Sequence, residues 1–105
     1  MITKIEKFSA TWCKPCKILS ENLKSILNAH PEIEFIEYDA DEHSEIFEKM
    51  NIKNVPQLLF YNEDEMIIHR LVGLRNSQQI NDLIDWHNKI KKDYSPYNPD
   101  YLIDK

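Results

Sequence analysis

Residues 10–17 read Ala-Thr-Trp-Cys-Lys-Pro-Cys-Lys, and this stretch decides how the rest of the chain is interpreted. Its two cysteines, Cys13 and Cys16, are the only cysteines among 105 residues. Two thiols at this spacing can close into a disulfide with little movement of the backbone. Such a disulfide encloses a very short loop and adds little stability, so a structural cross-link explains the pair poorly.

A zinc site is the second alternative for the pair. Tetrahedral zinc needs two further ligands, and the chain has no third cysteine and no histidines at the usual ligand spacing, so we expect no metal. The favoured chemistry is reversible thiol–disulfide exchange, in which one cysteine attacks and its neighbour resolves.

Composition and charge narrow the class of protein further. Hydrophobic residues make up 42% and charged residues 30%, as in a single globular domain. The net charge of -5 argues against nucleic acid or an anionic membrane as partner, and favours a neutral or basic protein surface. We see no secretory signal and no apolar run of membrane-spanning length, so we expect a cytoplasmic location. We also expect a monomer. In a reducing compartment, two close cysteines are more often catalytic than structural.

Hydrophobic periodicity predicts the order strand, helix, strand, helix, strand, strand, helix. The strands are expected at residues 2–9, 33–38, 57–61 and 66–72, and the helices at about 13–28, 41–50 and 77–91. The first helix would bury one apolar stripe, made of Ile18, Leu19, Leu23, Ile26 and Leu27. Ser77 is the expected N-cap of the last helix.

These elements predict an α/β fold. A strand-helix-strand unit gives a parallel pair, and a hairpin adds antiparallel strands, so we expect a mixed four-stranded sheet with helices on both faces. The domain would span residues 1–92, followed by a C-terminal tail at 93–105.

The stretch 10–17, with Val55-Pro56 and Val72-Gly73 further along, resembles the thioredoxin family. The resemblance covers residues 1 to about 91, without the extra N-terminal strand and helix of full-length members. It implies the thioredoxin fold, arranged βαβ-α-ββα, and a protein-disulfide reductase whose redox centre is the Cys13–Cys16 disulfide, with no dissociable cofactor. It also implies disulfide-containing client proteins, ribonucleotide reductase among them, and a flavoprotein similar to thioredoxin reductase as the NADPH-dependent electron donor.

The resemblance assigns the two cysteines different roles. Cys13 is similar to the family's nucleophile, exposed at the start of the helix, and Cys16 to the buried resolving thiol. The helix N-terminus, with Lys14 and Lys17, should lower the pKa of the Cys13 thiol below its usual value of about 8.5. Lys14 and Pro15 would also contact substrate.

Three further positions resemble parts of the family's substrate site. Trp12 is similar to the tryptophan that packs on substrates, although it could be half-buried core. Pro56 is similar to the cis-proline that faces the cysteines, with Val55 offering main-chain groups to a substrate, although a trans-proline is the ordinary alternative. Gly73 is similar to the glycine that lets a substrate backbone approach, or is only a turn residue.

Two departures from the family pattern concern residues near the cysteines. Thioredoxins usually hold a buried aspartate six residues before the nucleophile and a lysine on the adjacent strand, and here those positions are Lys7 and Glu37. We therefore hypothesise a buried ion pair beneath Cys16 with its charges exchanged, the alternative being that both side chains reach solvent. Ser9 stands where thioredoxins often have another tryptophan.

Two other functions remain open from the sequence. A glutaredoxin-like enzyme reduced by glutathione would usually show Cys-Pro-Tyr-Cys rather than the Cys-Lys-Pro-Cys of residues 13–16. A non-catalytic binding module could keep the fold without the chemistry, although both cysteines are present.

Overall fold

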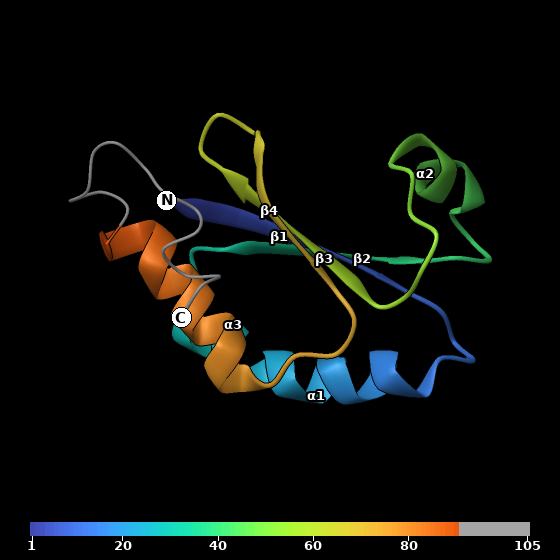
Figure 1. Cartoon of the computed structure of the whole chain (residues 1–105), viewed down its shortest axis with the longest axis horizontal. Helices are drawn as coiled ribbons and strands as arrows, with labels where there is room; N and C mark the ends of the chain where they lie inside the picture. Colours follow the sequence, from blue (N-terminus) through green and yellow to red (C-terminus); the bar gives the residue numbers. More distant parts are fainter. Residues whose placement is uncertain (91–105) are drawn as a thin grey trace.

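The strand that leads into the cysteines, β1 (Ile2–Ser9), is an inner strand of a four-stranded sheet with the order β2-β1-β3-β4 (Figure 1). It pairs in parallel with β2 (Glu34–Asp39) and antiparallel with β3 (Gln57–Asn62). β4 (Ile67–Val72) pairs antiparallel with β3 at the other edge. The expected mixed sheet is confirmed.

The computed structural model describes residues 1–90. The predicted domain boundary at residue 92 and the predicted tail at 93–105 lie outside these described residues. Within them, the helices are α1 (Lys14–Ala29), α2 (Ser44–Lys49) and α3 (Ser77–Asp85), and a π-helical turn, η1 (Trp86–Ile90), continues α3.

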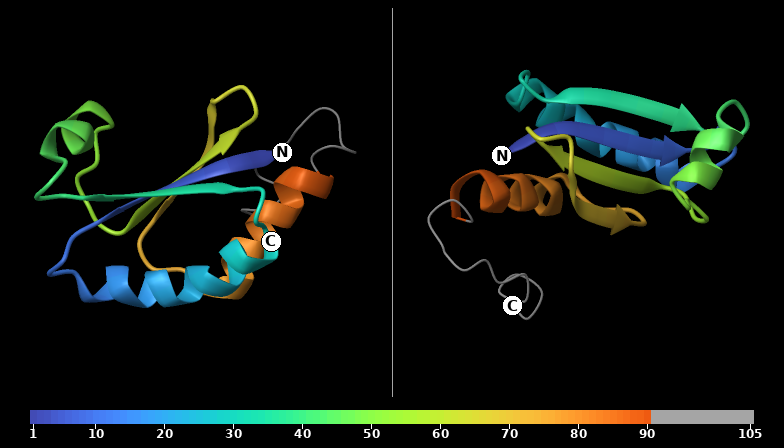
Figure 2. Two further views of the ribbon diagram at one scale, coloured as in Figure 1. Left: turned by 180° about the vertical axis from the view of Figure 1, so that it is seen from behind. Right: turned by 90° about the horizontal axis from the view of Figure 1, so that it is seen from above.

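The alternation of side chains along β1 builds two hydrophobic cores, one on each face of the sheet. Ile5 faces α1 and α3 and belongs to a core that includes Leu19 and Ile80. Phe8 faces the opposite way and packs with Phe47 of α2. Figures 1 and 2 show this arrangement, with α1 and α3 on one face of the sheet and α2 on the other.

The parallel register between β1 and β2 places Lys7 beside Glu37. Lys7 shares the face of Ile5, so its side chain points toward α1 and not toward α2. This register is what brings a charged pair under the first turns of α1.

Some predicted boundaries were wrong in detail. α1 begins at Lys14 because Cys13 has an extended backbone and serves as the N-cap. Ile18 is 42% exposed and does not belong to the buried stripe of α1. The N-cap of α3 is Asn76, not Ser77, and it forms a capping box with Gln79.

Two predicted helices are shorter in the structure. α2 covers only residues 44–49, and α3 gives way to the π-helical turn after Asp85. None of the helices within residues 1–90 combines the length and apolarity that a membrane span requires.

Candidate active site

The redox centre lies where β1 ends and α1 begins. Cys13 and Cys16 form a disulfide, and their Cα atoms are 5.3 Å apart. Cys13 is the N-cap of α1, and its Sγ accepts a hydrogen bond from the Cys16 N–H at 3.2 Å. Pro15 lies in the first turn, where a missing N–H is not needed, and that turn contains no acidic residue. A negative charge developing on Cys13 would therefore meet an N–H donor and the positive end of the helix.

The disulfide is well covered in this oxidised state. Cys13 is 5% exposed and Cys16 is 2% exposed, so the prediction that Cys13 is exposed is wrong for this state of the protein. Both sulfur-bearing residues pack with Ala10, and Ala40 and Val55 close over them. Little of either residue is therefore open to solvent.

Trp12, the residue before Cys13, lies at the protein surface. It is 69% exposed, so it is not a core residue. It lines a groove of about 420 Å³ together with Ala40, Phe47, Ile52, Lys53, Asn54 and Val55. The groove therefore offers an apolar binding surface next to the disulfide.

Pro56 precedes β3 and Gly73 follows β4, the strand that pairs with β3. The Val55–Pro56 peptide bond is cis, and Pro56 is fully buried. The Gly73 N–H donates to the Pro56 carbonyl at 2.9 Å, and Gly73 has a φ of 94°, a conformation that favours glycine. The structure thus brings Trp12, Val55, Pro56 and Gly73 to the same end of the sheet as the disulfide.

Lys7 and Glu37 do form an ion pair, with the Lys7 Nζ 2.8 Å from the Glu37 Oε2. Lys7 is 1% exposed, but the Glu37 side chain is 42% exposed, so the expected burial of both partners is wrong for Glu37. The Lys7 Nζ also donates to Ser20 Oγ at 2.5 Å, and the Ser9 hydroxyl donates to the same Glu37 oxygen at 2.7 Å. The buried ammonium therefore has two hydrogen-bond acceptors, one of them charged.

The protonation of Glu37 follows from these contacts. Burial tends to raise the pKa of the Glu37 carboxyl, whereas hydrogen bonds from Lys7 and Ser9, and the positive charge of Lys7, lower it. The net effect holds the pKa below its ordinary value, so Glu37 is ionised at neutral pH.

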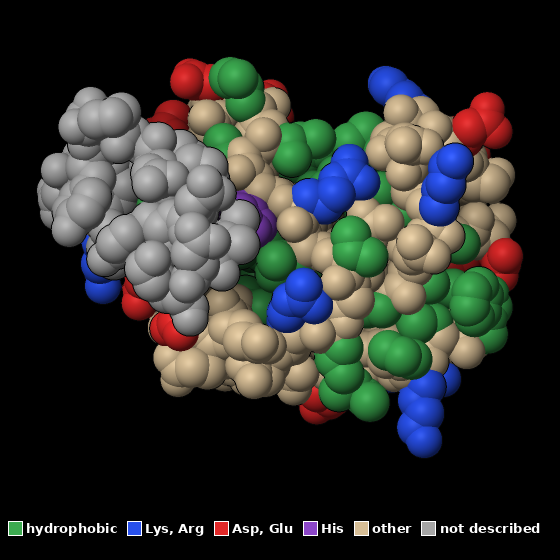
Figure 3. Space-filling view, viewed as in Figure 1, with side chains coloured by type: hydrophobic (Ala, Val, Ile, Leu, Met, Phe, Trp, Pro, Cys, Tyr) green, Lys and Arg blue, Asp and Glu red, His purple; other side chains and the backbone are tan. Residues whose placement is uncertain are grey.

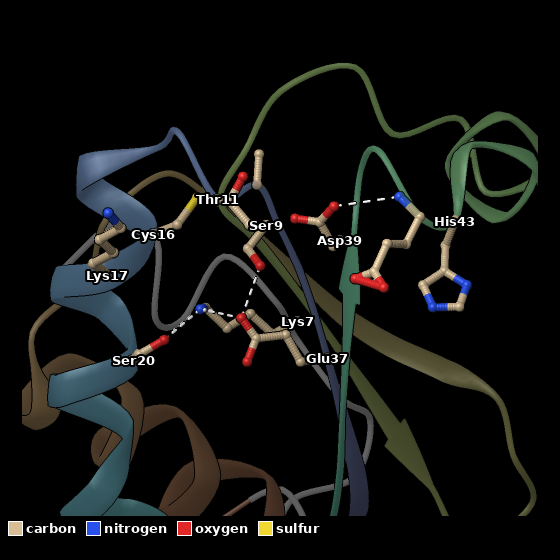
Figure 4. A pocket seen from close by; sticks show the side chains of 11 residues that line it. Lys7, Ser9, Thr11, Cys16, Lys17, Ser20, Glu37, Asp39 and His43 are labelled. Carbon is tan, nitrogen blue, oxygen red and sulfur yellow. Dashed lines mark hydrogen bonds and ion pairs between the residues drawn. The ribbon is translucent and has the colours of Figure 1, made fainter.

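This network lies in a polar cavity of about 400 Å³ that reaches Cys16 but not Cys13 (Figure 4). Lys7, Ser9 and Glu37 line it, and Ser20 and Lys17 close it on the side of α1. Sequence reasoning did not identify Ser20, although its position four residues after Cys16 puts it on the same face of α1.

A cysteine pair at a helix N-terminus, opposite a cis-proline and beside an exposed tryptophan, defines a thiol–disulfide oxidoreductase site. Comparison with known proteins agrees. The family model described as Thioredoxin matches residues 3–86. The chain is 32% identical over 77 residues to a thioredoxin of Ophiophagus hannah, covering 73% of this chain and 71% of that protein.

Two further comparisons extend this result. The chain is 30% identical over 66 residues to the mitochondrial thioredoxin-3 of Saccharomyces cerevisiae, covering 63% of this chain but 51% of that protein. It superimposes on the structure of Plasmodium falciparum thioredoxin with a TM-score of 0.69 and 32% identity, covering 78% of each chain.

The chain belongs to the thioredoxin family, and its Cys13–Cys16 disulfide makes it a thiol–disulfide oxidoreductase.

Proposed function

We propose that this protein is a protein-disulfide reductase that acts as a monomer and needs no dissociable cofactor. The observation that carries the proposal is the placement of Cys13 as N-cap of α1, beside the apolar groove of about 420 Å³ that Trp12 lines. The electrons it delivers would be stored in the cysteine pair itself.

Two exchange steps account for the reaction. The Cys13 thiolate attacks one sulfur of the client disulfide, the Cys13–client bond forms, and the other client sulfur leaves as a thiolate that takes up a proton. Cys16 then loses its proton and attacks the Cys13 sulfur. The Cys13–Cys16 bond forms, the second client sulfur leaves, and two electrons have passed to the client.

In this proposal Trp12 and Val55, which line the groove, hold the client. Residues at the same end of the sheet would assist them, namely Lys14, Pro15, Pro56 and Gly73. An extended segment lying against the cis-proline would meet the main chain of Val55 on one side and Gly73 on the other. Gly73 leaves room there because it has no side chain. Within this proposal, Trp12 covers the mixed disulfide from the side of the groove.

We further propose that a flavoprotein similar to thioredoxin reductase regenerates the dithiol from NADPH in a reducing compartment such as the cytoplasm. Ribonucleotide reductase is one candidate client. The similarity to thioredoxins over residues 3–86 supports this donor over glutathione.

The experiment compares the two donors directly. Reduction of a disulfide-bonded test protein such as insulin is followed with NADPH and a thioredoxin reductase, and separately with glutathione and its reductase. We expect turnover with the first system and little with the second. Efficient turnover only with glutathione would favour the glutaredoxin-like alternative. Full biological activity of a Cys13→Ser, Cys16→Ser double variant would favour the binding-module alternative.

A further inference from the structure

The cations of this protein divide into two groups by their partners. Within residues 1–90, ion pairs are formed by Lys4, Lys7, Lys24 and Lys89. Six other cations form no ion pair with a carboxylate among these described residues: Lys14, Lys17, Lys49, Lys53, Arg70 and Arg75. Lys17 lines the polar cavity beside Cys16, and Lys49 ends α2. The other four, Lys14, Lys53, Arg70 and Arg75, lie in one region.

That region surrounds the client groove. Lys14 lies between the cysteines, and Lys53 lines the groove with Trp12. Arg70 donates to the side chain of Gln57, the residue after Pro56, and Arg75 donates to the carbonyls of Val72 and Leu74 on either side of Gly73. Figure 3 shows Lys and Arg side chains spread over the face between α2 and α1, with Asp and Glu at its margins.

The opposite side of the disulfide contains several carboxylates. β2 ends at Asp39, and the turn after it contains Asp41 and Glu42; both Asp39 and Glu42 line the polar cavity beside Cys16. Because the strand order is β2-β1-β3-β4, the disulfide at the end of β1 lies between this acidic side and the cationic side at β3 and β4. Carboxylates therefore lie beside Lys7 and Lys17 on the cavity side, whereas the residues that line the groove include Lys53 and no carboxylate.

We propose that the groove selects client segments whose reactive cysteine carries acidic side chains on one flank and none on the other. The acidic flank would lie over the β3–β4 side, against Lys53, Arg70 and Arg75. This inference rests on the proposed protein-disulfide reductase function and names the class of client. It also replaces the expectation, drawn from net charge alone, of a neutral or basic partner surface.

Exposed apolar side chains in the same region favour a protein over a nucleic acid as the occupant. Trp12 is 69% exposed, Val72 45% and Leu74 40%. The contact area would come from these side chains, and the cations would select the client and speed its encounter.

The test uses the reduced protein and four peptides, each with one cysteine held as a mixed disulfide with 5-thio-2-nitrobenzoate. The peptides carry two aspartates before the cysteine, two after it, two on both sides, or serines only. Release of the coloured thiol gives the second-order rate constant without any electron donor. We expect one of the single-flank peptides to react about 10-fold faster than the serine peptide at low ionic strength, falling to about twofold in 0.5 M salt.

Two variants with the same change in net charge locate the effect. Lys53→Glu should lower the preference for the acidic flank by about threefold, whereas Lys24→Glu, far along α1 and paired with Glu21, should leave it unchanged. Far-UV circular dichroism checks that both variants are folded, and the salt dependence of the unmodified protein provides an independent measure.

Three results would overturn the inference. Equal rate constants for the acidic and serine peptides would remove it while leaving the reductase proposal intact, because the serine peptide still reacts. Failure of all four peptides to react would remove both. Stronger inhibition by a single-stranded oligonucleotide than by an acidic peptide without cysteine would show that the cationic region binds nucleic acid instead.

Discussion

The two sides of the Cys13–Cys16 disulfide are lined by different types of side chain. On the groove side, Trp12 is exposed, apolar side chains dominate, and the charges are unpaired cations. On the cavity side, Lys7 is buried and held by two oxygen-bearing side chains, those of Ser20 and Glu37. The difference indicates a division of work, in which the groove meets the client and the cavity supports the resolving cysteine from within the fold.

The largest effect expected from this comparison separates the two cysteines. Cys13→Ser should lower the rate of disulfide reduction by about 1,000-fold or more, because the attacking sulfur is gone. Cys16→Ser should still attack but should accumulate a stable mixed disulfide, detectable by mass spectrometry. A mixed disulfide that accumulates in Cys13→Ser and not in Cys16→Ser would reverse the assignment of the two sides.

A double-mutant cycle tests the cavity side. Glu37→Gln leaves the buried Lys7 ammonium without its carboxylate and should lower the free energy of unfolding by about 2 kcal/mol, less than for a fully buried pair because Glu37 is half-exposed. Adding Lys7→Met removes the uncompensated charge, and the double variant should recover most of the loss. Urea unfolding measures all four proteins. Additive losses would show that the two residues do not act as a pair.

The same Glu37→Gln variant also tests whether the Lys7–Glu37 pair affects the reactivity of Cys16. Glu37 lines the cavity that reaches Cys16, so loss of its charge should move the pH dependence of Cys16 alkylation in the reduced protein, measured in a Cys13→Ser background. Ser20→Ala removes a hydrogen-bond partner of Lys7 and keeps the carboxylate, so it serves as the matched control. Unchanged alkylation profiles in Glu37→Gln would restrict the pair to a structural role.

On the groove side, Gly73→Ala should lower the free energy of unfolding by a smaller amount than Glu37→Gln. A Cβ at this position would lie 3.6 Å from Arg75 Nη1, an ordinary contact, so the penalty comes from the backbone φ of 94° and should be about 1 kcal/mol. Because the Gly73 N–H is bonded to the Pro56 carbonyl, the rate with a peptide disulfide should also fall. A variant with unchanged stability would mean that the loop relaxes freely, which would weaken the picture of a preformed groove.

The groove and cavity also differ in how far the sequence predicts them. The order of elements could be predicted because hydrophobic periodicity is a local signal. The cis bond before Pro56 was expected only from the resemblance to thioredoxins, since a trans-proline is the ordinary alternative. The low exposure of Cys13 and the high exposure of Ile18 could not be predicted, since the exposure of each residue depends on which segments pack against it. The separation of the carboxylates after β2 from the cations near β3 and β4 likewise depends on strand order, because β2 and β4 lie on opposite sides of β1.

The smallest expected effect is the pH dependence of the cavity side. The folded-state pKa of Glu37 is lowered, after the opposing effect of burial, by Lys7 and Ser9, so its ionisation stabilises the fold above the unfolded pKa of about 4.3. That stabilisation is lost as the pH falls through the folded value, where a protonated Glu37 resembles glutamine. The difference in unfolding free energy between the unmodified protein and Glu37→Gln should therefore be constant from about pH 7 to pH 5 and shrink at lower pH. A difference that persists undiminished at about pH 2 would have to come from the shape of the side chain and not from its charge.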